Sequence, residues 1–339
     1  MLYSKYEGFL SLSKGKRILL TTHDLVDIDG LASCYALKYF LNEYYNTPLI
    51  SILFSELTRA TKNFMVRFTE KFPKFDFKFD KRVDSTKFDL CIIIDTNDIQ
   101  QLRYSDKKEF LLDLPYIIVD HHYTVEEKLK IDQNNLFNLL NDNISSSAEI
   151  ILDLYDYFKQ ILPLPYKYLL SAAILTDSGF FRHGNNTTIK NISNLLDEEV
   201  SFQEMTMMLQ NQSDISEKIA KIKGLQRVKL IREGNYLIGI SRVSSFKAKV
   251  ASTLIKIGFD ISLVYSRDKN KNIINCRASK DVISRTGLHL GRIFEETSQK
   301  FEGSGGGHDG AASITFKADF ETILLDIREK INQFLTSKF

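Results

Sequence analysis

The 339-residue sequence contains no tryptophan, only three cysteines and five prolines, and no long apolar run. Cys34, Cys91 and Cys276 are far apart and form no Cys-x-x-Cys pair. This excludes a disulfide framework or a thiolate metal site, and predicts three buried apolar side chains. The longest apolar runs, such as residues 90–94, are far too short to span a bilayer, and the N-terminus lacks the pattern of a secretory signal. We therefore expect a cytoplasmic protein with no membrane segment.

The composition is that of an ordinary globular protein, with 43% hydrophobic and 26% charged residues, in a chain long enough for two domains. The net charge of +2 hides an asymmetry. Residues 216–339 contain 22 Lys and Arg against 13 Asp and Glu, or +9, and the rest contains 23 against 30, or −7. An acidic front half suits bound cations, and a basic back half suits an anionic substrate. The ordinary explanation is that the net charge of solvent-exposed helix faces varies by several units without any functional reason.

The front half alternates apolar strands with helices. Strands are expected at residues 17–22, 48–54, 75–79, 88–94 and 116–119, and helices at 31–45, 61–72 and 166–175. A further helix, capped by the serine-rich segment 145–149, is expected to run to about residue 159. Most of these strands are continuous apolar runs, which suits burial on both faces of a parallel sheet. The pattern predicts an α/β fold with a doubly wound parallel sheet. Polar residues that follow such strands gather at the carboxyl edge of the sheet.

Acids and imidazoles follow three of these strands and one helix. They are His23, Asp27 and Asp29 after the first strand, Asp95 after 88–94, Asp120, His121 and His122 after 116–119, and Asp177 after 166–175. Neutral imidazole and carboxylate are ligands that Mn²⁺ or Zn²⁺ accept. Each residue also has an ordinary interpretation, such as a helix cap for Asp29 or a turn former for Asp95. Six of them resemble, as a set, a two-metal centre with a shared carboxylate: His23, Asp27, Asp29, Asp95, His121 and Asp177.

The order of these residues carries a family resemblance. The series His23-x-x-x-Asp27-x-Asp29, Asp95, Asp120-His121-His122 and Thr176-Asp177-Ser178-Gly179 resembles motifs one to four of the DHH phosphoesterase superfamily. That superfamily includes RecJ exonucleases, nanoRNase/pAp phosphatases, cyclic-di-AMP phosphodiesterases and family II pyrophosphatases. Val26 stands where a proline is usual, at a position that supplies shape rather than a ligand.

The resemblance implies a role for each residue. One Mn²⁺ would be held by His23, Asp27 and Asp95, and the other by Asp29, Asp95, His121 and Asp177, with Mg²⁺ or Co²⁺ as alternative ions. Asp95 would bridge the two ions. His122 would contact the scissile phosphate, and Asp120 would orient a ligand.

The back half begins a second pattern of strands and helices. We expect a catalytic domain over residues 1–187, a linker helix over 188–223 and a smaller α/β domain over 224–339, with the active site in the cleft between the domains. Within the last domain, strands are expected at 227–231, 236–241, 261–266 and 273–277, and helices at 245–257 and 288–301.

Five of the sixteen glycines lie within residues 303–310. Such density indicates close backbone approach or positive φ, with a flexible surface loop as the ordinary interpretation. The stretch from Leu290-Gly291-Arg292 through Gly305-Gly306-Gly307-His308 resembles the substrate-binding domain that accompanies the DHH module in nucleases. The resemblance implies that Gly305, Gly306, Gly307, His308 and Arg277 grip the phosphate and nucleotide of the substrate.

These observations predict a Mn²⁺-dependent phosphodiesterase. The first hypothesis is a RecJ-like 5′-3′ exonuclease that releases nucleoside monophosphates from single-stranded DNA, or from RNA. The alternative is a nanoRNase/pAp phosphatase or a cyclic-di-AMP or dinucleotide phosphodiesterase, which the presence of only two minimal domains favours. A third hypothesis, a nonenzymatic scaffold, predicts lost ligands, yet every expected ligand is present. The expected partner is single-stranded nucleic acid or a short oligonucleotide. A processing nuclease would also suit a helicase or a repair or replication protein.

Overall fold

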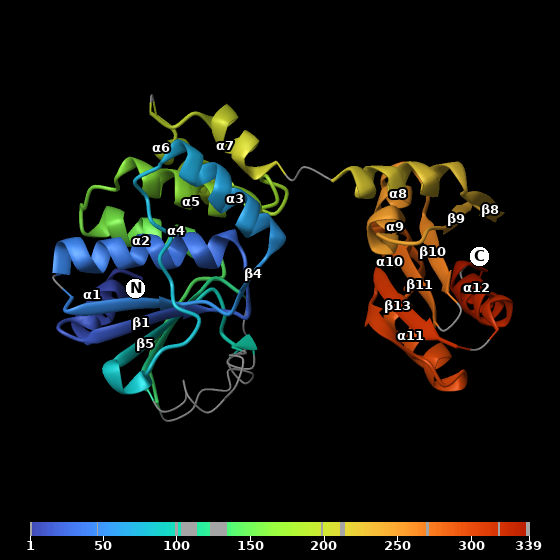
Figure 1. Cartoon of the computed structure of the whole chain (residues 1–339), viewed down its shortest axis with the longest axis horizontal. Coiled ribbons are helices and arrows are strands. Elements are labelled where there is room, and N and C mark those ends of the chain that lie inside the picture. The colour runs from blue at the N-terminus through green and yellow to red at the C-terminus, as the bar shows by residue number, and fades with distance from the viewer. Residues whose placement is uncertain are drawn as a thin grey trace. The chain divides into compact units, whose positions relative to one another are not determined.

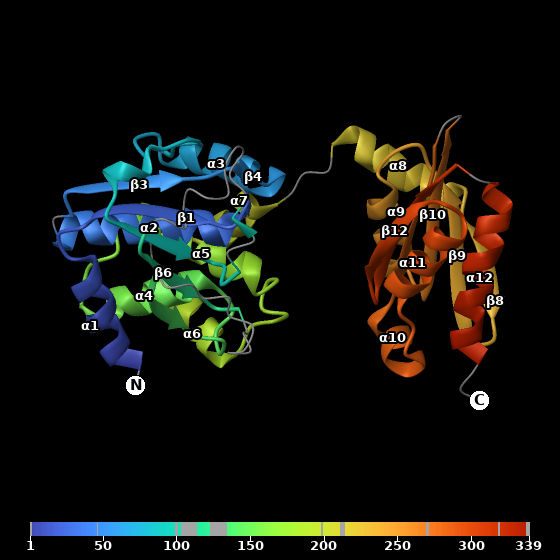
Figure 2. The ribbon, with the colours of Figure 1, turned by 90° about the horizontal axis from the view of Figure 1, so that it is seen from below.

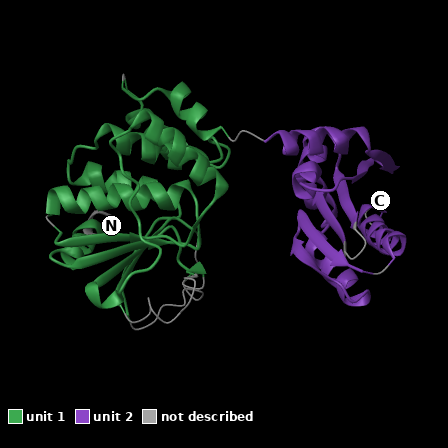
Figure 3. Ribbon diagram, viewed as in Figure 1, with its two compact units in different colours: residues 1–211 green, residues 212–339 purple. Residues whose placement is uncertain are grey.

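In the computed structural model the chain forms two compact units, Met1–Asn211 (unit 1) and Gln212–Phe339 (unit 2), shown in Figure 3. The structure describes residues 2–45, 47–98, 101–102, 114–122, 134–197, 199–210, 214–268, 271–317 and 319–336. Within these ranges no helix has the length and apolar character needed to cross a membrane. All three cysteines are unpaired and buried, as predicted.

Unit 1 is built on a five-stranded parallel sheet with the strand order β3-β1-β5-β6-β7 (Figure 1). The strands are β1 (Arg17–Thr22), β3 (Leu49–Leu53), β5 (Leu90–Ile94), β6 (Tyr116–Asp120) and β7 (Asn135–Leu140). From β1 the chain adds β3 on one side of the sheet and β5, β6 and β7 on the other. The prediction of a doubly wound parallel sheet is therefore confirmed, and the order reverses between β1 and β5.

The central strand β5 is apolar throughout because both of its faces are covered. In β5, Ile92 and Ile94 join the larger core, whereas Cys91 and Ile93 join a smaller core on the opposite face. Helices α2, α4 and α5 lie over one face (Figures 1 and 2). The helices of unit 1 are α1 (Leu2–Ser13), α2 (Ile28–Tyr45), α3 (Arg59–Lys71), α4 (Ser147–Tyr157), α5 (Leu164–Asp177), α6 (Asn186–Leu195) and α7 (Phe202–Leu209).

Two strand predictions in unit 1 need correction. Residues 75–79 form no strand, because Phe75 and Phe77 pack edge-on against the rings of Phe68 and Tyr35, with centroids 5.1 and 5.2 Å apart. The alternation of aromatic and polar residues in this segment therefore results from packing in an aromatic cluster and not from pairing in a β-sheet. The sequence pattern also missed β7, an edge strand in which Asn135 and Asn138 interrupt the apolar run.

The segment 188–223, expected as one linker helix, contains parts of three helices: most of α6, all of α7 and much of α8 (Ile215–Gln226). Each has its own N-cap side chain, from Asn185, Ser201 and Asp214 respectively. Three caps mean three helix starts. α6 and α7 belong to unit 1 and α8 to unit 2. The domain limits at 187 and 224 stay a prediction.

Unit 2 contains a six-stranded mixed sheet with the order β12-β13-β11-β10-β9-β8. The strands are β8 (Lys229–Glu233), β9 (Tyr236–Arg242), β10 (Ile261–Asp268), β11 (Lys271–Ala278), β12 (Ser304–His308) and β13 (Ala311–Phe316). Helices α11 (Leu290–Lys300) and α12 (Phe320–Thr336) share a core with one face, and α8 and α9 (Lys247–Lys256) share a second core with the other. A short helix, α10 (Lys280–Thr286), follows β11.

Candidate metal centre

The candidate centre lies where the strand order of unit 1 reverses. His23 follows β1, and Asp95 follows the neighbouring strand β5. His121 follows β6, which pairs with the other side of β5. Because the three strands are parallel, their carboxyl ends bring these side chains together at one edge of the sheet.

The loop between β1 and α2 is held by a two-stranded sheet of β2 (Leu25–Val26) and β4 (Glu56–Leu57). The Ser55 hydroxyl, between β3 and β4, donates to Asp24 Oδ1 over 2.8 Å, so this acid ties the loop to the neighbouring connection. Asp27 Oδ1 accepts a bond from the Gly30 amide at 3.0 Å and so caps α2. This cap starts α2 at Ile28, three residues earlier than the apolar pattern predicts.

Asp29 lies inside the first turn of α2 and caps a different helix. Its carboxylate is 1% exposed and accepts bonds from the amides of Ser147 (2.7 Å) and Ala148 (2.9 Å), the first two residues of α4. The Ser33 hydroxyl donates to Asp29 Oδ1 over 3.2 Å. The alternative interpretation of Asp29 as a cap of its own helix is therefore wrong, because Asp27 takes that place.

Asp95 is the most central of the candidate ligands. It is 2% exposed and has a φ of 63°, a left-handed conformation that is uncommon outside glycine and clusters at functional sites. Its amide donates to the Val119 carbonyl, which fixes the turn at the end of β5. Asp95 Oδ2 lies 3.5 Å from His23 Nε2, and Oδ1 lies 3.4 Å from His121 Nε2.

The remaining candidate ligands surround Asp95. His121 Nε2 lies 3.1 Å from Asp177 Oδ2, at the C-terminal end of α5, and His23 Nε2 lies 3.7 Å from Asp27 Oδ1. Ligand atoms lie within 4.8 Å of one another in each of three groups, which are His23, Asp27 and Asp95; Asp29, Asp95, His121 and Asp177; and Asp95, Asp120, His121 and His122. The first two groups have the membership that the resemblance implies, and Asp95 is common to all three.

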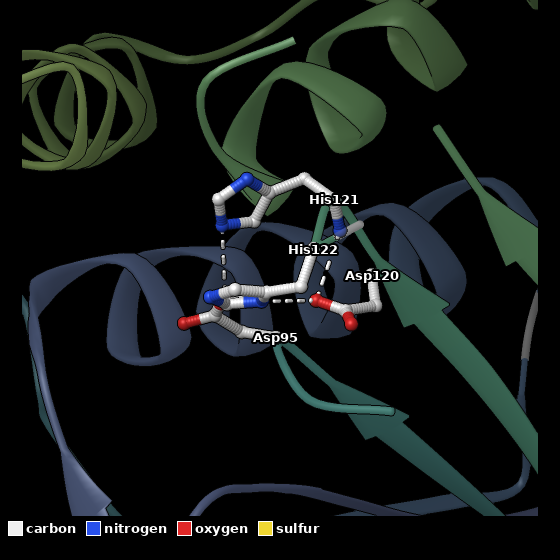
Figure 4. A group of neighbouring side chains, drawn as sticks. All are labelled: Asp95, Asp120, His121 and His122. Atoms are coloured by element: carbon white, nitrogen blue, oxygen red, sulfur yellow. Dashed lines mark hydrogen bonds and ion pairs between the residues drawn. The ribbon is translucent and has the colours of Figure 1, made fainter. Parts of the chain in front are cut away.

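Asp120 and His122 form the third group with Asp95 and His121 (Figure 4). The Asp120 side chain is fully buried, and its Oδ1 accepts a bond from the His121 amide at 2.9 Å and lies 2.8 Å from His122 Nδ1. Because a carboxylate is an acceptor, it orients the His122 ring with a proton on Nδ1. The bond to Asp120 raises the pKa of His122, whose side chain is 56% exposed. A partly exposed imidazole whose pKa is raised suits contact with a phosphate oxygen.

The electrostatics of the centre favour bound positive charge. Burial alone would lower the pKa of each imidazole, but the carboxylates outweigh it and raise the pKa of His23 to about 10 and of His121 to about 11. Burial raises the pKa of Asp29 and Asp177, and the nearby Asp95 raises both further. Burial also opposes ionisation of Asp95, yet its bonds to the two imidazoles lower its pKa to about 2.

The donor set fits divalent cations. Imidazole nitrogen and carboxylate oxygen are the ligand types that Mn²⁺ and Zn²⁺ accept, and a cation would supply the charge that protons on His23 and His121 otherwise provide. His121 Nε2 is buried and has no hydrogen-bond partner of good geometry within the described ranges. The acidic and histidine cluster therefore indicates a divalent metal site, and the residue-by-residue ligand assignment stays a prediction.

In unit 2, strand register places Arg277 and His308 on one face of the sheet. Both residues pair with Ala311 of β13, from opposite sides, so their side chains flank a methyl group. One step along, Asn275 and Gly306 flank Ser313 in the same way. The side chains on this face are half-buried or exposed, whereas the alternating residues of β11 and β13 are buried.

Asn275 and Ser313 thus share the face of Arg277 and His308, which sequence reasoning missed. The available signal was the two-residue alternation of strands, which gives residues 275 and 277 the same side.

The glycine-rich segment is an edge strand, β12, paired with β13, so the interpretation as a flexible surface loop is wrong. Gly307 has a φ of 153°, and a Cβ at this position would lie 2.1 Å from the Ala311 carbonyl oxygen. A side chain there would push β12 away from β13. This residue must be glycine so that His308 reaches its place opposite Ala311.

Comparison with known proteins identifies the class. Residues 17–175 match the N-terminal domain of the DHH family, and residues 240–337 match the DHHA1 domain. The chain therefore contains a DHH domain followed by a DHHA1 domain, which supports a hydrolase acting on phosphoester bonds.

Individual proteins are similar to the chain in sequence or in fold. The chain is 27% identical, over 312 residues, to the uncharacterized protein MJ0988 of Methanocaldococcus jannaschii, covering 91% of this chain and 90% of that protein. Its fold is similar to that of an exopolyphosphatase-related protein from Bacteroides fragilis, with a TM-score of 0.67, 17% identity and coverage of 98% and 97% of the two chains. It also resembles CDC45 from Entamoeba histolytica, with a TM-score of 0.53, 10% identity and coverage of 96% and 98%.

Proposed function

We propose that the protein is a Mn²⁺-dependent phosphodiesterase, and that it acts as a RecJ-like 5′-3′ exonuclease releasing nucleoside monophosphates from single-stranded DNA or RNA. The observation that supports this most is the sharing of Asp95 by the group of His23 and Asp27 and by the group of Asp29, His121 and Asp177. A carboxylate with one oxygen toward each group is the arrangement by which two-metal hydrolases hold a pair of ions.

Each residue has a defined task in this proposal. His23 and Asp27 would hold one Mn²⁺, Asp29, His121 and Asp177 the other, and Asp95 both. When bound, the ions would lower the pKa of water and polarise the phosphate. Asp120 fixes the orientation of the His122 ring, and the His122 imidazole would donate a hydrogen bond to a phosphate oxygen on which charge develops.

Unit 2 supports an anionic substrate. A guanidinium can donate two parallel hydrogen bonds to a phosphate. The guanidinium of Arg277 lies on the same face of the sheet as His308. The basic balance of residues 216–339, 22 Lys and Arg against 13 Asp and Glu, would attract a polyphosphate strand from solution. We infer that this face binds the terminal nucleotide of a single strand.

A second candidate substrate is a dinucleotide or a similarly short molecule, such as pAp or cyclic-di-AMP. The width across β11, β13 and β12 suits either candidate, because two strand spacings of about 4.8 Å each make roughly 10 Å, room for about one nucleotide. A grip of this width holds one nucleotide regardless of how long the attached strand is. Substrate length therefore separates the two candidates.

A digestion series tests the proposal. End-labelled DNA and RNA of two to thirty nucleotides, together with pAp and cyclic-di-AMP, would be incubated with the full chain and Mn²⁺, and the products would be resolved by size. A rate that rises with length, with monophosphates leaving from the 5′ end, supports the exonuclease. A maximum at two or three nucleotides supports the second candidate. No hydrolysis of any of these substrates would contradict both.

A further inference from the structure

Helix α4 begins against the candidate metal centre without a cap of its own. The N-cap residue Ser146 makes no capping hydrogen bond with its side chain. The first two amides of the helix are instead satisfied by the buried Asp29 carboxylate, which accepts from Ser147 and Ala148. The positive end of the helix dipole therefore faces a carboxylate that we assign to the second metal ion.

Ser147 also contacts the carboxylate that both metal groups share. Its hydroxyl donates to Asp95 Oδ1 over 3.2 Å, while its own amide donates to Asp29 Oδ2 over 2.7 Å. The side chain of Ser147 is fully buried, as are those of both acids to within 2%. One serine thus joins two candidate ligands that come from different elements, α2 and the end of β5.

A buried glutamate fixes the position of this serine. Glu149, two residues further along α4, accepts bonds from the amide (2.9 Å) and the hydroxyl (2.7 Å) of Ser145. Its other oxygen accepts from Asn191 Nδ2 of α6 at 2.8 Å. The turn that leads into α4 is therefore tied to α6, and the Ser147 hydroxyl has a defined place beside Asp95.

We propose that Ser147 is a positioning residue for the metal centre, which acts through Asp95 and Asp29 and does not itself touch an ion or the substrate. This inference rests on the proposed metal-dependent function. Asp95 has a left-handed backbone, so neighbouring groups must hold its side chain in the orientation that presents an oxygen to each group. The Ser147 hydroxyl restrains Oδ1 from the side of α4, and Oδ2 faces His23. Hydrogen bonds of this kind keep metal ligands oriented before the ion arrives.

The test is Mn²⁺ affinity, measured by titration calorimetry on the full chain without substrate. Ser147→Ala removes the hydroxyl and keeps the amide that caps Asp29, and Ser147→Cys keeps the volume but donates weakly. We expect both variants to bind Mn²⁺ about 10- to 100-fold more weakly than the native chain. Ser171→Ala is the matched control, because Ser171 of α5 is equally buried and its hydroxyl has no partner within the described residues. It should bind Mn²⁺ as the native chain does.

Two results would overturn the proposal. One is a Mn²⁺ affinity of Ser147→Ala within twofold of the native value. The other is native affinity in Ser147→Cys, which would mean that the side chain fills space and does not orient Asp95. A native chain that binds Mn²⁺ but cleaves no phosphodiester would refute the proposed function and leave the role of Ser147 intact. A native chain that binds no Mn²⁺ would refute both.

Discussion

The metal centre of unit 1 and the glycine strand of unit 2 are built in opposite ways. In unit 1 the candidate ligands Asp29 and Asp95 are buried and cross-bonded to α4, the latter through Ser147. In unit 2, Arg277 and His308 stand on a sheet face with one methyl group between them, and His308 is exposed. In the first arrangement, hydrogen bonds within the protein orient the buried carboxylates, whereas the second is open to solvent.

This difference suits two different functions, catalysis in unit 1 and substrate binding in unit 2. A centre that must stabilise charge in the transition state gains from groups that are already oriented in a dry site. A surface that must accept substrates and release products gains from exposure. We therefore expect changes in unit 1 to lower kcat, and changes on the face of unit 2 to raise KM.

The largest expected effect comes from Asp95→Ala, which removes the acid common to all three ligand groups. We expect kcat/KM for a phosphodiester to fall at least about 10³-fold, or roughly 4 kcal/mol of transition-state stabilisation. His121→Ala should act similarly, because its ring lies beside both Asp95 and Asp177. Circular dichroism would verify that each variant is folded. Turnover near the native rate in either one would break the assignment of the centre.

Metal addition sharpens the comparison because only one unit should respond. At a free Mn²⁺ concentration of 100 times its Kd, we expect unit 1 to gain about 2.7 kcal/mol of stability for each ion that binds. Hydrogen exchange with mass spectrometry, with Mn²⁺ or with a chelator, would locate the gain, expected in peptides from β1, β5, β6 and α4. Asp95→Ala is the control that should abolish it. Equal protection of unit 2 peptides in the native chain would contradict the separation of the two regions.

Arg277→Ala tests the open face. A lost hydrogen bond to a charged phosphate weakens binding by about 1.5 to 3 kcal/mol, so KM should rise roughly 10- to 100-fold with kcat little changed. Steady-state kinetics on a short oligonucleotide would measure both constants. Arg285→Ala removes the same charge from unit 2 at an exposed position on α10, paired with Asp281, and should leave KM unchanged. Equal effects of the two substitutions would indicate that only net charge matters.

The smallest effect concerns a carboxyl away from the centre. Burial, with Asp156 and Glu149 nearby, raises the pKa of Asp153 to about 6. Because this pKa is higher in the folded state than in the unfolded chain, Asp153 favours folding below about pH 4. That contribution is lost as the pH rises through 6.

Asp153→Asn should therefore leave stability nearly unchanged at pH 4 and increase it by about 1 kcal/mol at pH 8, a value discounted for partial contact with water. Urea unfolding at the two pH values would measure this. A constant difference between variant and native chain at both values would argue against titration of Asp153.

Much of unit 1 could be predicted from the sequence because buried parallel strands leave continuous apolar runs. β1 has the predicted limits, and β5 lies within two residues of them. The grouping of His23, Asp95 and His121 then follows from topology, since parallel strands end at one edge. The start of α2 could not be predicted from the sequence, because Asp27 is both the residue that caps this helix and a candidate metal ligand.

The rest depends on contacts between distant parts of the chain. Nothing local distinguishes Ser147 from an ordinary residue of a serine-rich helix start, and its function appears only when α4 is placed beside Asp29 and Asp95. Likewise, only the pairing register of β11 with β13 shows that Asn275 and Ser313 share a face with Arg277 and His308. Aromatic side chains misled the prediction at 75–79 because alternation is shared by strands and by irregular segments that pack onto a core.

The bond between Asp29 and the start of α4 joins residues 118 positions apart, and this has a consequence for how the protein is made. During translation, a nascent chain that has not yet reached Ser147 carries an acid destined for the interior with no amide to receive it. Unit 1 therefore acquires its full ligand geometry only after α4 has left the ribosome. Ion capture by the growing polypeptide should come late in synthesis, after most of the parallel sheet has been produced.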